Sequence, residues 1–144
     1  MWRDFILQQT EHATFAPSAS AAAITDAETV LSISFPDELR TILRESNGVI
    51  GQYELGLVWD LDRIQRDNLQ FRGDSDFRDL YMPFDHLLFF ADAGNGDQFA
   101  FPIQNGIIHR NDVFVWDHES DDRRWVAGSL KQYLQWWLDG TLTL

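Results

Sequence analysis

The sequence contains no cysteine, Lys131 is its only lysine, and it has no long apolar run. Without cysteine the chain can form no disulfide, no thiolate metal site and no thiol nucleophile, which fits a reducing compartment. No stretch approaches the roughly 18 consecutive apolar residues that a membrane helix needs. The first residues, MWRDFILQQTEH, hold too short an apolar run for a signal peptide. We therefore expect a cytoplasmic protein that does not enter a membrane.

Acidic residues outnumber basic ones by 23 to 11, which gives a formal net charge of −12. Such a surface repels phosphate backbones, so binding to nucleic acid or to an anionic membrane is not expected. It attracts basic proteins and accelerates their encounter. A surplus of acids also serves solubility alone, so the charge by itself is compatible with both interpretations.

Aromatic residues make up 14% of the chain and include six tryptophans and eleven phenylalanines. Many of these rings will fill the core of a single domain over residues 1–144. Because the chain is short, we expect some rings to remain exposed, where they can anchor an interface.

Apolar residues at helical spacing predict three helices in the first third of the chain, beginning near Trp2, Thr25 and Pro36. Thr25 and Glu28 have the spacing of a capping box, in which each side chain bonds a free amide at the start of the helix. Asn47–Gly48 would end the third helix, since both residues tolerate a left-handed backbone.

The second half of the chain changes to an extended pattern. The run Leu87–Ala91 is continuously apolar, so it predicts a strand covered on both faces. A last helix begins at Ser129 and stops at Gly140. The pattern predicts strands over 53–59, 87–91, 98–103, 113–116 and 124–126, a short polar helix over 61–69, and mostly loop over 70–85.

These elements predict an α+β fold, with a central, mostly antiparallel sheet and flanking N-terminal and C-terminal helices. We expect the helices to gather on one side of the sheet. Between two of the strands, Asn95–Gly96 has the chemistry of a tight primed turn with two positive φ angles. A phosphate-binding loop would need a following helix and a lysine, and the EF-hand calcium pattern is absent.

One short motif could carry chemistry: Asp117, His118 and Glu119 could bind a divalent metal or act as an acid and base. However, the four histidines, His12, His86, His109 and His118, lack the paired spacing of metal ligands. No serine occupies a nucleophile elbow. We therefore predict no catalytic residue, no metal and no cofactor, and keep a metal-dependent hydrolase as the less favoured alternative.

The order of several motifs resembles the SUKH superfamily, which is built on the Smi/Knr-type domain. The resemblance covers a core of about residues 24–138. Its motifs are ITDAE at 24–28, FPDEL at 35–39, SNG at 46–48, ADAGNGDQFAF at 91–101, VFVWDHE at 113–119 and SLKQYLQWWL at 129–138.

This resemblance implies an α+β fold and a role in binding. Bacterial members are chiefly immunity proteins that neutralise toxins, often nucleases, whereas eukaryotic members act as regulatory scaffolds. The family brings no catalytic residue. The matching residues that we interpret as fold-specifying are Pro36, Gly48, Gly96, Asp97 and Trp116.

Charge and resemblance together suggest an immunity protein that binds a basic toxin domain, with carboxylates replacing phosphates and aromatic rings as anchors. A small-ligand or regulatory scaffold module of the same fold is the alternative. The predicted partner-binding residues are Asp74, Asp76, Asp79, Asp92, Asp117, Glu119, Asp121, Asp122 and Trp136.

Overall fold

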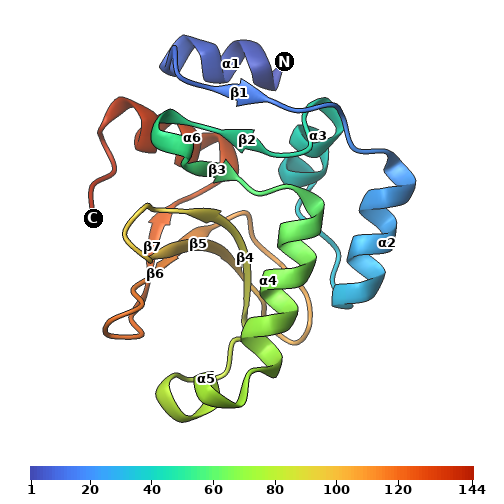
Figure 1. Ribbon diagram of the computed structural model, residues 1–144, viewed down its shortest axis with the longest axis vertical. Coiled ribbons are helices and arrows are strands. Elements are labelled where there is room, and N and C mark those ends of the chain that lie inside the picture. Colours follow the sequence, from blue (N-terminus) through green and yellow to red (C-terminus); the bar gives the residue numbers. More distant parts are fainter.

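A four-stranded antiparallel meander forms the centre of the computed structural model, which describes residues 1–144 (Figure 1). Its strands follow one another in chain order and are β4 (Leu87–Asp92), β5 (Gln98–Pro102), β6 (Val113–Trp116) and β7 (Arg123–Ala127). A smaller antiparallel sheet contains β1 (Thr14–Phe15), β2 (Val49–Ile50) and β3 (Gly56–Val58). The helices are α1 (Trp2–Gln9), α2 (Ala21–Leu31), α3 (Asp37–Glu45), α4 (Leu61–Gly73), α5 (Ser75–Leu80) and α6 (Leu130–Asp139). The predicted α+β fold is confirmed.

The β4 strand is covered on both faces, as its apolar run predicts. On one face, Tyr133 of α6 packs against Phe90 and Phe99, with ring centroids 5.4 and 4.6 Å apart. On the other face, Phe71 and Phe84 lie 4.9 and 5.6 Å from Phe89. The expectation that the helices gather on one side is therefore wrong, because apolar side chains on both faces of a strand each require a cover.

The outer edge of β4 is closed by α4, which runs beside it (Figure 1). Asn68 of α4 is buried, and its amide group donates to the carbonyl of Phe89 at 2.9 Å and accepts from the Phe89 amide at 2.8 Å. One residue along, the Trp59 amide donates to the Phe90 carbonyl at 2.8 Å. The side chain of Asn68 thus replaces a neighbouring strand, and the edge cannot pair with another chain.

The strand predicted over 53–59 is shorter in the structure. Tyr53 and Glu54 have φ angles of 58° and 59°, a left-handed conformation that breaks the extended run, so β3 begins only at Gly56. They belong to a single 3₁₀ turn, Gln52–Glu54. Alternation of apolar residues could not reveal this reversal.

Two helix predictions also need correction. The α2 helix begins one turn earlier than expected, because Ser20 accepts a hydrogen bond from the Ala23 amide and caps it. Glu28 is no capping residue: its carboxylate accepts bonds from the Phe35 amide and from Arg40. The segment 70–85, predicted as mostly loop, contains the last turn of α4 and the whole of α5.

The loop between β4 and β5 forms a hairpin, as expected, but not a two-residue turn. Gly94 and Gly96 have φ angles of 99° and 100°, whereas Asn95 is not left-handed. The side chain of Asn95 instead accepts a hydrogen bond from the Asp97 amide at 3.0 Å. The next hairpin, at Asn105–Gly106, does have two positive φ angles, 53° and 74°.

None of the six helices has both the length and the apolar character that crossing a membrane requires.

We expect Asn68→Leu to lower the free energy of unfolding by about 3 kcal/mol, because it leaves the buried amide and carbonyl of Phe89 without partners. Urea denaturation measures the change. The matched control is Gln70→Leu, at an exposed position of the same helix, which should change stability little. Equal effects of the two substitutions would contradict the role given to Asn68.

Candidate functional site

The acids predicted to bind a partner divide into two groups, according to whether their carboxylates already have partners within the chain. Asp92 belongs to the first group. It makes two hydrogen bonds with the Arg63 guanidinium, at 2.6 and 2.8 Å, and that guanidinium also lies 4.1 Å over the Trp59 ring. Asp92 therefore joins α4 to β4 and is not available as a free charge.

Asp121 is the most heavily bonded of these acids. It accepts hydrogen bonds from the Trp116 indole at 2.8 Å, the Met82 amide at 2.8 Å and the Arg123 guanidinium at 2.9 Å. Burial alone would raise the pKa of Asp121, but these three donors outweigh burial and hold it below its ordinary value. Asp121 thus fixes the segment that follows α5 onto the β6–β7 turn.

Two further acids shape local backbone. Asp74 caps α5 by accepting a hydrogen bond from the Asp76 amide at 2.8 Å. Asp117 accepts from the amides of Glu119 and Ser120, at 2.9 and 3.3 Å, and these bonds lower its pKa. Both carboxylates organise the loops that carry their neighbours.

The second group consists of exposed acids whose carboxylates have no partner in the chain: Asp76 and Asp79 on α5, and Glu119 and Asp122 on the β6–β7 turn. The two elements lie far apart in sequence but are joined directly. The Tyr81 hydroxyl donates to the His118 carbonyl at 2.8 Å, which adds to the bond between Met82 and Asp121.

Arg123 reinforces this junction by donating to the carbonyls of Met82 and Pro83, at 2.8 and 2.9 Å. We name the combined region, residues 74–82 with residues 117–122, the α5–turn surface. Trp136, the remaining predicted contact, is not part of it. It lies half-buried on α6, with its ring 6.5 Å from that of Trp125.

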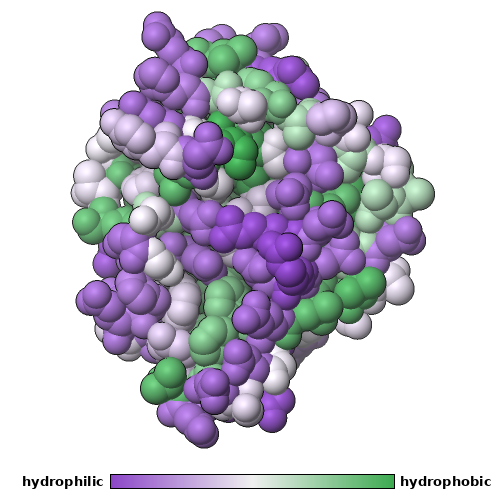
Figure 2. Space-filling view, viewed as in Figure 1, coloured by the Kyte–Doolittle hydropathy of each residue, from purple (hydrophilic) through white to green (hydrophobic).

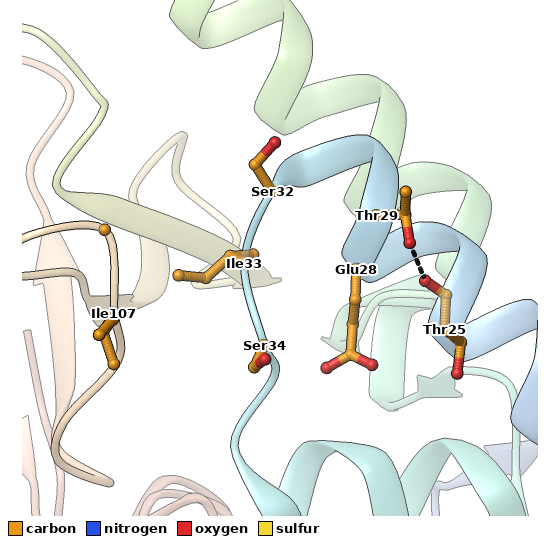
Figure 3. A pocket seen from close by; sticks show the side chains of 8 residues that line it. Thr25, Glu28, Thr29, Ser32, Ile33, Ser34 and Ile107 are labelled. Carbon is orange, nitrogen blue, oxygen red and sulfur yellow. Dashed lines mark hydrogen bonds between the residues drawn. The ribbon is translucent and has the colours of Figure 1, made fainter.

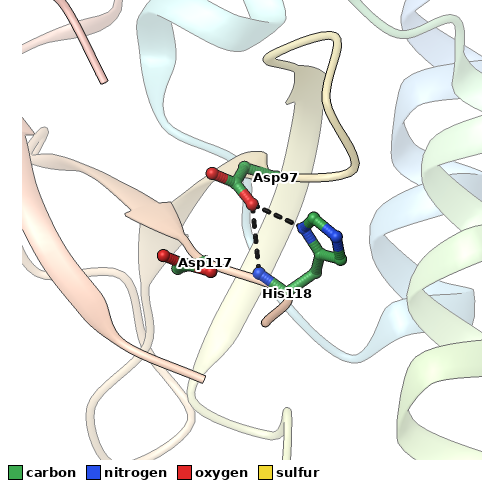
Figure 4. Close-up of side chains that lie close together, drawn as sticks. All are labelled: Asp97, Asp117 and His118. Carbon is green, nitrogen blue, oxygen red and sulfur yellow. Dashed lines mark hydrogen bonds and ion pairs between the residues drawn. The ribbon is translucent and has the colours of Figure 1, made fainter. Parts of the chain in front are cut away.

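The residues that could hold a metal are Asp97, Asp117 and His118, whose ligand atoms lie within 4.8 Å of one another (Figure 4). Glu119, which the hydrolase alternative included, is not in this group. One oxygen of Asp97 accepts from both the His118 amide, at 3.1 Å, and the His118 ring nitrogen Nδ1, at 2.7 Å. The Asp97 oxygen that bonds His118 and the Asp117 oxygen that bonds the turn are therefore already engaged within the chain. The group is better described as a latch between the β4–β5 loop and the end of β6.

The structure explains why particular residue types are required at four of the five positions predicted to specify the fold. At Gly96, a Cβ atom would lie 2.8 Å from the His118 ring, and at Gly48 it would lie 3.0 Å from the Asp60 amide nitrogen. Trp116 is buried, and its indole is held by Asp121. Pro36 is also buried and directly precedes α3.

A hollow of about 380 Å³ lies between α2 and the hairpin that carries Ile107 (Figure 3). Its only charged lining residue is Glu28, whose carboxylate is already bonded to the Phe35 amide and to Arg40. The Thr29 hydroxyl is bonded to the Thr25 carbonyl, as Figure 3 also shows. No free charge is aimed into this hollow, so the small-ligand alternative gains no support here.

The sequence prediction missed the residues that join the two parts of the α5–turn surface: Tyr81, Met82 and Arg123. A usable signal was present, since Asp74 has the character of a helix cap and Phe77 and Tyr81 have the i, i+4 spacing of a buried helical face. Phe77 and Tyr81 do pack together, with centroids 5.9 Å apart.

The fold and the site together define a class: an acidic α+β domain in which two elements far apart in sequence join and present four free carboxylates on one exposed surface. Comparison with known families identifies the class more closely. The family model SUKH_6, described as SMI1-KNR4 cell-wall, matches residues 21–134, so the chain belongs to this family and the predicted resemblance is confirmed. No curated protein gave a significant match to the chain.

We expect Gly96→Ala to lower stability by about 2 to 4 kcal/mol, because the added methyl group combines backbone strain with a clash against His118. Gly106→Ala is the matched control. Gly106 also has a positive φ, but a Cβ there meets nothing within 4 Å, so we expect a loss of about 1 kcal/mol. Thermal unfolding of both variants compares the two losses, and equal values would contradict the close packing against His118.

The hydrogen bond that the His118 ring donates to the Asp97 carboxylate raises the pKa of His118 above its ordinary value of 6.5, and the charges of Asp97, Glu119 and Asp117 add to this effect. The protonated ring is therefore favoured in the folded state. Its stabilisation is complete below about pH 6.5 and is lost as the pH rises through the raised pKa. An NMR titration of the ring should have its midpoint above 6.5, and Asp97→Asn should lower that midpoint. No difference between wild type and variant would refute the latch.

Proposed function

We propose that this protein is an immunity-type binder that neutralises a basic toxin domain by covering its cationic surface. The observation that carries the proposal is the α5–turn surface, where Asp76, Asp79, Glu119 and Asp122 remain free although many other acids of the chain have internal partners. Membership of the SUKH superfamily supports it, since bacterial members chiefly act in this way.

The inhibition needs no chemistry in this chain. A nuclease presents Lys and Arg side chains to the phosphates of its substrate, and carboxylates held on a folded domain can occupy the same positions. The net charge of −12 extends the attraction beyond the contact itself and raises the rate of encounter. Once formed, the complex blocks access of the substrate to the toxin.

The partner to test is the basic C-terminal domain of the toxin encoded beside this protein in its genome. We expect a one-to-one complex whose association rate falls about tenfold or more between ~50 and ~500 mM salt, because salt screens the attraction. Stopped-flow or surface plasmon resonance measures this rate. Expression of the protein should also protect cells that produce the toxin domain.

Binding with a flat salt response would favour the regulatory scaffold alternative, in which apolar contacts on a concave face dominate. Failure of the two proteins to bind at low salt, or a genome without a basic toxin domain beside this gene, would overturn the proposed function.

A further inference from the structure

The outward face of α5 combines charge with exposed apolar side chains. Asp76, Asp79 and Leu80 have i, i+3, i+4 spacing and so lie on one side of the helix. Leu80 is 70% exposed, and Met82, two residues further on, is 59% exposed. Figure 2 shows apolar atoms among hydrophilic ones at the end of the molecule where α5 lies in Figure 1.

Aromatic side chains hold α5 from its inner side. The inward face of the helix is formed by Phe77, which packs 5.2 Å from Phe71, and by Tyr81, which packs 5.1 Å from Trp116. Met82 is fixed by its backbone, through its amide bond to Asp121 and its carbonyl bond to Arg123. The side chains of Leu80 and Met82 are therefore held on a rigid support while remaining open to solvent.

An apolar centre with a charged rim is the arrangement of a protein interface, in which a few large side chains lose their contact with water and surrounding polar groups fix the partner. The free acids of the two joined elements, Asp76, Asp79, Glu119 and Asp122, supply that rim. We infer that Leu80 and Met82 form the centre of the toxin-binding contact, and that the partner presents an apolar side chain surrounded by Lys and Arg. This inference rests on the proposed function.

Charge decides which partner fits. A second copy of this chain would bring the four rim acids against the same four acids, and an anionic lipid surface would be repelled in the same way. Arg78 is the basic residue that α5 contributes among these acids. A basic protein surface is the occupant whose charge complements this rim.

The test uses Leu80→Gln with Met82→Gln, which removes the apolar centre without changing net charge. We expect the affinity for the basic toxin domain to fall about tenfold or more, mainly through faster dissociation. Leu7→Gln on α1 is the matched control, because Leu7 is 51% exposed on a helix at the opposite end of the molecule. It should leave the affinity unchanged, and thermal unfolding confirms that all variants fold.

A second pair of variants separates the rim from the centre. Asp76→Asn with Asp79→Asn should slow association with the toxin domain and weaken the dependence of the association rate on salt. The control is Glu11→Gln with Asp26→Asn, which changes the net charge equally at exposed positions elsewhere. It should reduce the association rate and its salt dependence less. Hydrogen exchange on the complex should show protection at residues 74–82 and 117–122.

The outcomes distinguish this inference from the proposed function. If the wild type binds the toxin domain and the Leu80 and Met82 variant binds equally well, the contact lies elsewhere and the inference is wrong, although the function stands. If the wild type does not bind, the function itself fails. A dimer in sedimentation equilibrium that the same variant dissociates would show that a second copy covers this face, and would overturn the inference.

Discussion

The structure depends on the way in which Asn68 completes the edge of β4. One buried side-chain amide satisfies both the N–H and the C=O of Phe89. These two bonds fix the position of α4 along β4. The position of α4 determines where Phe71 meets Phe84 and Phe89, and these rings form the surface on which the next segment packs. Because an unpaired backbone group in the core is strongly destabilising, the register of α4 against β4 has little freedom.

The α5–turn surface is built on this base by contacts between distant parts of the chain. Phe77 and Tyr81 pack on the aromatic cluster, and Asp121 and Arg123 bind the backbone that follows α5. The Asp97–His118 latch bonds the same turn to the β4–β5 loop. Carboxylates with partners in the chain, among them Asp121 and Asp97, therefore position the elements that carry the free carboxylates.

The sequence predicted elements whose signal is local and repeated. The run Leu87–Ala91 gave both the strand and its burial on two faces, and the Ser129 cap gave the start of α6, since Ser129 accepts from the Gln132 amide. The predicted bounds were wrong where the backbone conformation or the capping bond of one residue decides where an element begins, because the apolar pattern does not report either. Tyr53 adopts a left-handed conformation, and Ser20 caps α2 ahead of the expected start.

The candidate site could be predicted only as a set of residue types. The sequence showed that acids are concentrated over residues 74–79 and 117–122. It could not show that Asp92 pairs with Arg63 and Asp121 with Arg123, because those ion pairs form only in the folded state. Nor could it bring α5 against the turn, which depends on contacts across some 40 residues of chain, such as that of Met82 with Asp121.

The two sides of α5 have consequences for how this protein can evolve. Phe77 and Tyr81 secure the helix from within, whereas Asp76, Asp79 and Leu80 make no contact that the rest of the fold requires. Substitutions at these outward positions can therefore accumulate at little cost in folding. Under the proposed function, such substitutions would change which partner is bound while the fold stays the same.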